Sequence, residues 1–153
     1  MPDDIGLFEA IYTQRVLRYL KSEPVPEELI RKLIESATKA PSGTNRQPWK
    51  FIVIRDPDLK RRIGEYYLGA WEAAYGDQTS VRPRVSSSIK QSATHLAEHM
   101  HEVPVLILVC IEHDGSPSTM VRGASIYPAV QNLLLAARGL GLVLGQRGFK
   151  DVI

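Results

Sequence analysis

The residues with the clearest chemical potential form a loop of small and amide-bearing side chains, Pro41–Trp49, with the sequence PSGTNRQPW. Gly43 would allow a ligand to approach the backbone closely, and Ser42 and Asn45 carry hydrogen-bonding groups. Pro41 also ends the preceding helix, so the same residues could form only a helix end and a turn. The loop is therefore a candidate ligand site with a purely structural alternative.

Two arginines three residues apart, Arg15 and Arg18, precede this loop. On a helix end or a turn they could hold a phosphate together through charge-assisted hydrogen bonds. Two solvated arginines that bind nothing would explain the same pattern. Exposed charged side chains are common on protein surfaces and often contribute nothing measurable to stability. The pair alone does not specify an anion site.

A cluster of histidines and glutamates raises the question of a metal site; its members are His95, Glu98, His99, His101 and Glu102. His95 and His99 are four residues apart on one predicted helical face, as zinc ligands can be. In the metalloprotease signature a glutamate directly follows the first histidine, and the order His-Leu-Ala-Glu-His lacks it. A polar helix face explains these residues, and no cysteine lies nearby. We expect no metal site.

The elements that must position these residues are helices interleaved with strands. Apolar residues at helical spacing predict five helices, beginning near residues 7, 26, 59, 89 and 124. Apolar runs predict strands at Trp49–Arg55, at Pro104–Ile111, which should be buried on both faces, and at Leu142–Leu144. The segment Gly76–Ser88 has no apolar period and is predicted to be an exposed loop of the length often seen in lids. The pattern favours a single α+β domain over residues 1–153, with helices on both faces of a small sheet.

Composition excludes several classes of function. Of the 153 residues, 44% are hydrophobic and 24% charged, and 19 basic residues against 17 acidic ones leave a net charge of +2. That balance is typical of a soluble domain and not of a nucleic-acid-binding surface. No apolar run approaches the ~20 residues that span a bilayer. Met1–Asp4 lacks the charged-then-apolar order of a signal peptide, and the single cysteine, Cys110, is predicted to be a buried thiol in a reducing compartment. We expect a cytoplasmic protein that binds neither nucleic acid nor membrane.

Taken together and in this order, the segments resemble the nitroreductase family. The resemblance lies in Arg15-Val16-Leu17-Arg18, in Pro24-Val25-Pro26 opening a helix, and in the loop Pro41–Trp49 leading into an apolar strand. Residues 95–99, 123–125 and 131–137 resemble family segments too. The resemblance covers about residues 5 to 145, and the loop is its most specific part.

This resemblance implies a three-layer α+β sandwich, with a small mixed sheet flanked by helices, that binds FMN as a homodimer. Arg15 and Arg18 would meet the FMN phosphate from one subunit. Near the isoalloxazine ring would lie Leu144 and Gly145, and the partner subunit would contribute a loop containing Pro41, Ser42, Gly43 and Asn45.

The implied activity is the transfer of two electrons from NAD(P)H through the flavin to a nitroaromatic, a quinone or a similar small acceptor. One site used in turn by both substrates gives a ping-pong mechanism. The catalytic residues remain unknown, since the cofactor carries the chemistry and solvent can supply the proton.

Departures from the family pattern lead to an alternative. The family often has two adjacent basic residues where this chain has Gln14-Arg15, and often serine where it has Val16. Family members also commonly continue for some tens of residues, so the C-terminal strand is expected to be missing. The alternative is a non-catalytic, truncated relative that keeps the fold and the dimer surface but binds flavin weakly or not at all.

Overall fold

A computed structural model of the chain describes residues 5–75, 86–112, 115, 120–142 and 144. The chain divides into two compact units. The first contains residues 1–15, 24–53 and 107–143, and the second contains residues 16–23, 54–106 and 144–153. The single domain over residues 1–153 stays a prediction.

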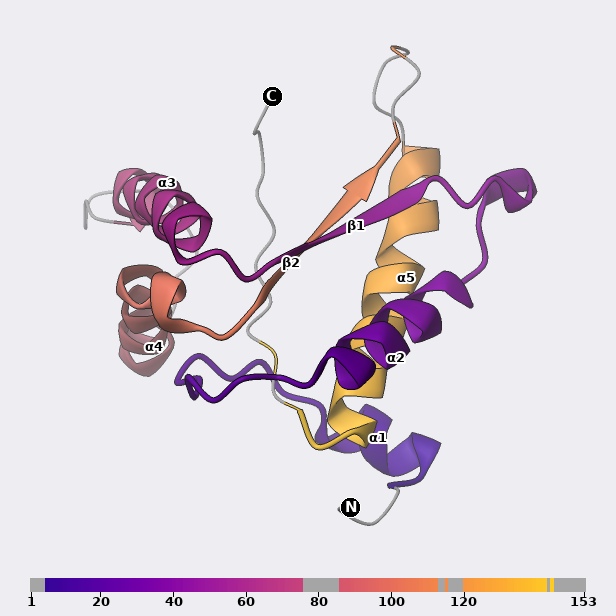
Figure 1. Cartoon of the computed structure of the whole chain (residues 1–153), viewed down its shortest axis with the longest axis horizontal. Helices are drawn as coiled ribbons and strands as arrows, with labels where there is room; N and C mark the ends of the chain where they lie inside the picture. The colour runs from indigo at the N-terminus through magenta and orange to yellow at the C-terminus, as the bar shows by residue number, and fades with distance from the viewer. Residues whose placement is uncertain (1–4, 76–85, 113–114, 116–119, 143, 145–153) are drawn as a thin grey trace. The chain divides into compact units, whose positions relative to one another are not determined.

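Three helices form the core of the first unit: α1 (Leu7–Thr13), α2 (Glu27–Thr38) and α5 (Met120–Gly139). Helix α2 packs along α5, and α1 packs on α5 (Figure 1). Pro26 precedes the first turn of α2, where its fixed φ suits a helix start and its missing N–H is not needed. The buried residues of the two larger helices are Ile30, Leu33, Ala37, Ala129, Leu133, Leu134 and Ala137. This apolar seam stabilises the unit through the area that it removes from water.

Two polar contacts tie the end of α1 to the carboxyl-terminal half of α5. The side-chain amide of Gln131 donates to Oε1 of Gln14 at 2.9 Å, and Nε of Arg138 donates to Oγ1 of Thr13 at 2.9 Å. The first helix ends at Thr13, beside the carboxyl-terminal half of α5.

The sheet consists, in the described residues, of β1 (Trp49–Ile54) and β2 (Leu106–Ile111). The strands are antiparallel: the N–H of Glu112, just after β2, donates to the carbonyl of Pro48, just before β1, at 2.7 Å. The mixed α+β class is confirmed.

Two expectations about strands were wrong. Every residue of β2 is only partly buried, Cys110 included, because a pair of strands leaves its faces incompletely covered. Leu142 and Leu144 lie outside any strand, and Val143 between them is outside the described residues.

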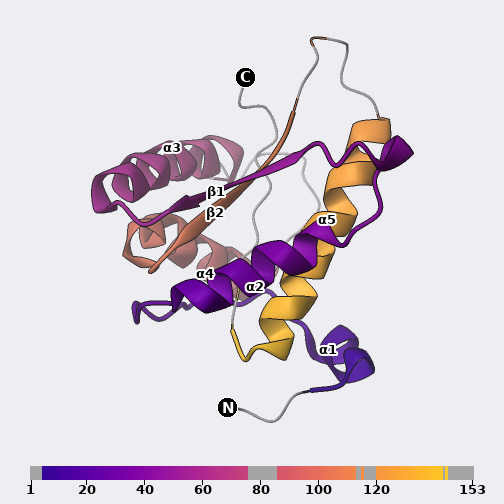
Figure 2. The same ribbon diagram turned by 45° about the vertical axis from the view of Figure 1, so that its right-hand side comes forward.

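The second unit is built from α3 (Pro57–Tyr75), α4 (Ser87–Glu98) and the short 3-10 helix η2 (Met100–Glu102). Helices α3 and α4 lie side by side (Figures 1 and 2). Their shared core contains Tyr67, Trp71, Ala93, Ala97 and Met100. The indole N–H of Trp71 donates to Oγ1 of Thr94 at 3.0 Å, which satisfies a donor that burial would otherwise leave unpaired.

Polar contacts set the ends of the second unit's segments. Oγ of Ser86 accepts from the N–H of Ile89 and caps α4, so this helix begins at Ser87, two residues before the predicted start. The buried Lys60 donates from Nζ to the carbonyl of Val103 at 2.7 Å, fastening the start of α3 to the segment before β2. Residues 76–85 of the predicted lid loop lie outside the described residues. Of the helices in the described ranges, none combines the length and the apolar character that crossing a bilayer requires.

Candidate cofactor site

The loop Pro41–Trp49 has an unusual backbone. It follows α2 and contains the 3-10 turn η1 (Gly43–Asn45). Thr44, Asn45 and Gln47 have φ values of 51°, 56° and 49°. L-residues rarely adopt this left-handed conformation, and a β-branched residue such as Thr44 is especially disfavoured there. Strained backbone of this kind clusters at ligand-binding and catalytic sites, so the conformation supports the ligand-site interpretation of the loop.

Hydrogen bonds within the loop maintain that shape. Oγ of Ser42 accepts from the N–H of Gln47 at 3.0 Å, and the Gln47 side chain donates to Oδ1 of Asn45 at 3.0 Å. The backbone N–H of Asn45 donates to the carbonyl of Ser42, also at 3.0 Å. The role of Gln47 in joining the two predicted site residues was missed in the sequence, although it lies within the recognised motif.

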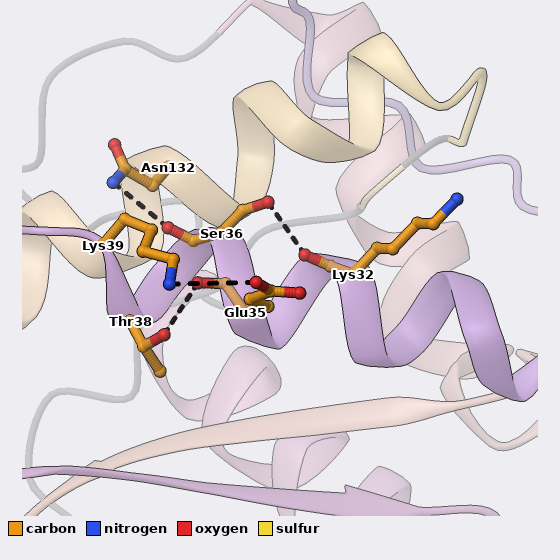
Figure 3. A network of polar contacts seen from close by, with 6 residues as sticks. All are labelled: Lys32, Glu35, Ser36, Thr38, Lys39 and Asn132. Atoms are coloured by element: carbon orange, nitrogen blue, oxygen red, sulfur yellow. Dashed lines mark hydrogen bonds and ion pairs between the residues drawn. The ribbon is translucent and has the colours of Figure 1, made fainter.

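Helix α5 bonds the loop at one point and the helix that leads into it at another. The N–H of Gly43 donates to Oγ of the buried Ser125 at 3.2 Å. Nδ2 of Asn132 donates to the carbonyl of Ser36 at 3.3 Å, in the last turn of α2, from which the loop departs (Figure 3). Sequence reasoning gave Ser125 no role, although residues 123–125 were among the segments that resemble the family.

Of the two predicted phosphate-binding arginines, Arg15 is exposed and belongs to the first unit. Its Nη1 donates to the carbonyls of Tyr12 at 3.0 Å and Gln14 at 2.6 Å. Both bonds use one nitrogen, so the other N–H groups of the guanidinium can still bind an anion.

Within one chain, Arg15 and the loop lie near different parts of α5. Arg15 follows α1, whose end is bonded to Gln131 and Arg138, whereas Gly43 is bonded to Ser125. At ~1.5 Å per residue the two contacts of α1 lie about 9 and 20 Å from Ser125 along the axis of α5. The hydrogen bonds of Arg15 go to Tyr12 and Gln14, and neither reaches the loop.

Arg18 is half-buried in the second unit. Its Nη1 donates to Oγ of Ser92 at 3.3 Å, while its buried Nε has no hydrogen-bond partner in the described structure. An unpaired buried donor is costly, and an anion would satisfy it. Arg18 also lines a small pocket together with Leu20, His95, Leu96, His99, Glu102 and Val103.

The histidines of this region are engaged with one another. The rings of His95 and His99 stack with centroids 4.1 Å apart, and Nδ1 of His99 lies 2.8 Å from the carbonyl oxygen of His95. Tyr19 packs on His95, and the centroids of these two rings are 4.4 Å apart. Across the described ranges, no group of three or more histidine, cysteine, aspartate or glutamate residues is arranged to hold a metal ion.

The remaining predicted site residues lie at the end of the chain. Leu144 is half-buried and belongs to the second unit, and Gly145 lies outside the described residues. Pro41 is exposed at the start of the loop. The proximity of Leu144 and Gly145 to a flavin ring stays a prediction.

The donor groups of these segments fit FMN, which presents a phosphate and a ring edge rich in hydrogen-bond acceptors. Ser42 and Asn45 act as acceptors in the loop, so the Ser42 hydroxyl proton and the Asn45 amide N–H groups can donate to a ligand. Arg15 and Arg18 carry the charge that a phosphate requires. The carboxylates and imidazoles of a metal site would not offer such hydrogen-bond donors to a phosphate.

Comparison with known proteins gives a consistent result. The family model described as Nitroreductase family matches residues 11–151. The chain is 43% identical over 142 residues to an iodotyrosine deiodinase of Nematostella vectensis, covering 89% of this chain and 53% of that protein. It is 33% identical over 140 residues to a putative NADH dehydrogenase/NAD(P)H nitroreductase of Methanothermobacter thermautotrophicus, covering 90% and 58%. The chain thus spans about half the length of the curated relatives that it matches.

A solved structure of oxidised iodotyrosine deiodinase bound to FMN and 3-iodo-L-tyrosine has the same fold. It aligns with a TM-score of 0.72 and 28% sequence identity, over 89% of this chain and 71% of that one.

Proposed function

Since this chain belongs to the nitroreductase family, we propose that it is an FMN-dependent oxidoreductase, which passes two electrons from NAD(P)H through the flavin to a small electron-poor acceptor. The observation that carries the proposal is the loop Pro41–Trp49. Its left-handed backbone is held in place by helix α5, and it keeps hydrogen-bond donors available on an exposed surface. The predicted location in the cytoplasm remains a prediction from the sequence.

Bound FMN would supply the ability to accept and return a hydride. The chain's own residues bind and orient the cofactor. Arg15 and Arg18 hold the phosphate through charge-assisted hydrogen bonds, and Ser42 and Asn45 orient the polar edge of the ring. Positive charge close to that edge also favours the negative charge that reduction adds.

The acceptor defines two candidate activities. The first activity is the reduction of a nitroaromatic or a quinone. The second is the reductive dehalogenation of a halogenated tyrosine, which the similarity to iodotyrosine deiodinases favours. Removing iodide from iodotyrosine consumes two electrons and one proton, breaks the C–I bond and forms a C–H bond. Both activities need only a donor of two electrons and one site that the donor and the acceptor occupy in turn.

Anaerobic titration of the FMN-loaded protein tests the proposal. NADH or NADPH should bleach the visible flavin absorption, and the productive acceptor should restore it. A nitroaromatic, a quinone and 3-iodo-L-tyrosine are compared side by side, with iodide release measured for the last. Protein that stays colourless after incubation with excess FMN would support the non-catalytic alternative instead.

The proposal includes a homodimer, because the predicted parts of the site are separated within one chain. The end of α1 is bonded to α5 about 9 and 20 Å along the helix axis from the residue that holds the loop, so a second copy that offers its loop to Arg15 would complete the site. Leu133 and Leu134 of α5 are buried within the described chain, so they leave no apolar face for a partner. Exposed large apolar side chains occur on several elements, and four of them lie close together in sequence on α1: Leu7, Phe8, Ile11 and Tyr12. A cluster of this kind is typical of an interaction surface.

Valine at position 43 should weaken flavin binding without unfolding the protein. Gly43 is exposed, so a larger side chain meets solvent or ligand rather than the core. The branched Cβ would obstruct close approach of the ring and disfavour the turn at Thr44. We expect a loss of affinity of roughly tenfold or more, on the order of 1.4 kcal/mol, with an unchanged circular dichroism spectrum.

Gly69→Val provides the matched control for this change. Gly69 lies within α3, and a Cβ added there meets nothing within 4 Å. That variant carries the general cost of valine in place of glycine but leaves the loop intact, so its flavin content should equal that of the parent. Full flavin occupancy in Gly43→Val would mean that the loop is only a turn.

A further inference from the structure

We infer that Ser125 of helix α5 is the positioning residue of the flavin loop, acting through the backbone N–H of Gly43. The inference rests on the proposed function, because it concerns how the loop Pro41–Trp49 is presented to FMN. Ser125 is 82 residues away from Gly43 in the chain, and it reaches the loop because α5 and η1 pack together.

The loop needs an external anchor because its internal bonds fix its shape but not its place. The bonds among Ser42, Asn45 and Gln47 all join residues of the loop itself. Three left-handed residues also make the loop conformation intrinsically unfavourable, so it persists only where surrounding contacts hold it.

Helix α5 supplies a rigid reference for the loop. Ser125 is 5% exposed, and Asn132 lies about two turns further on the same helical face. Ala129, fully buried, lies between them on that face. Ser125 therefore contacts the middle of the loop, while Asn132 holds the carbonyl of Ser36 at the end of the helix that leads into it (Figure 3).

The Ser125 hydroxyl should affect the position of the loop more than the stability of the fold. Gly43 is exposed, so water can take over its N–H when the Ser125 hydroxyl is removed. The fold should survive, while the loop samples positions that do not suit the ligand. If the ligand binds only one of several loop positions, its apparent affinity falls as the population of that position falls.

The test compares Ser125→Ala with Ser36→Ala in the full chain. Ser36 is a matched control because its hydroxyl donates to Lys32 within α2, and its replacement leaves the carbonyl that Asn132 binds (Figure 3). We expect Ser125→Ala to weaken FMN binding by roughly 2- to 12-fold and to shift the visible bands of the bound flavin, whereas Ser36→Ala does neither. Ser125→Thr keeps an Oγ at this position and should restore the parent's affinity.

Hydrogen exchange in the flavin-free protein provides the second readout. The Gly43 amide should lose protection in Ser125→Ala, whether or not the parent binds FMN, while the amides of α2 keep theirs. Unchanged protection at Gly43 would overturn the anchor. A parent that binds FMN with the same affinity as Ser125→Ala would overturn the positioning role, as would a folded Ser125→Thr that binds as weakly as the alanine variant. Failure of the parent to bind FMN contradicts the proposed function, and the exchange at Gly43 still decides the anchor.

Discussion

Replacing both Arg15 and Arg18 with alanine should weaken FMN binding by roughly 100- to 10,000-fold. Each charged hydrogen-bonding partner of a phosphate contributes on the order of 1.5–3 kcal/mol, or roughly 10- to 100-fold in affinity, and the two contributions add if the residues act independently. The reason for including Arg18 is its buried Nε, which lacks a partner in the described structure and would gain one from a phosphate. Flavin titration at fixed salt measures the effect, and each single variant should show part of it.

Two controls separate the phosphate contact from loss of charge and from loss of packing. Arg31→Ala removes an exposed arginine of α2 that pairs with Glu27, so it lowers the net charge without touching the site. Ser92→Ala removes the partner of Arg18 but keeps the guanidinium. Neither should change flavin affinity by more than about twofold. Unchanged affinity in both single arginine variants would contradict the assignment, and an equal loss in Arg31→Ala would reduce it to general electrostatics.

The helices were largely predictable because local signals indicate them, although α5 begins at Met120, four residues before its predicted start. Pro26 and the two glutamates that follow it begin α2, and Pro41 requires that it end before the loop. The start of α4 was missed by two residues because Ser86 caps it, and a serine among many gives no strong signal.

Burial of the strands was not predictable from the sequence. The apolar run of β2 indicated a strand buried on both faces, but burial depends on which layers cover the sheet. In the described chain β2 pairs with β1, and Ile52 of that strand is 50% exposed. Composition identifies a strand that could be buried, whereas its neighbours decide whether it is.

The chemistry of the site was predictable, but its geometry was not. The loop residues were recognisable by type, since small and amide-bearing side chains suit a ligand. No local pattern indicated that Ser42 and Asn45 would both be engaged by Gln47, or that a serine 82 residues away would hold Gly43. Such contacts follow from tertiary packing, which brings distant segments together.

Mixing two variants with weakened flavin binding should restore part of that binding if each site is shared between subunits. The FMN concentration is chosen to fill the parent and to leave each variant alone largely empty. The first variant lacks both arginines, and the second carries Gly43→Val. In a mixed dimer, one site would combine the mutated arginines of one chain with the mutated loop of the other. The second site would combine the intact arginines with the intact loop. Half of the dimers are mixed after random exchange, so about one quarter of the parent's FMN capacity should return.

The separation of Arg15 and the loop along α5 is the reason to expect this recovery. A site formed within one chain would be defective in both variants, and mixing them would restore nothing. Sedimentation with detection at protein and flavin wavelengths shows whether the returned flavin travels with a dimer, and an isotopic label on one variant shows that the subunits have exchanged. The parent dimer should also become more stable with rising protein concentration and with added FMN, because both favour the associated state. Labelled chains that exchange without regaining flavin, or a stable parent monomer that carries a full complement of FMN, would show that the site does not need a partner.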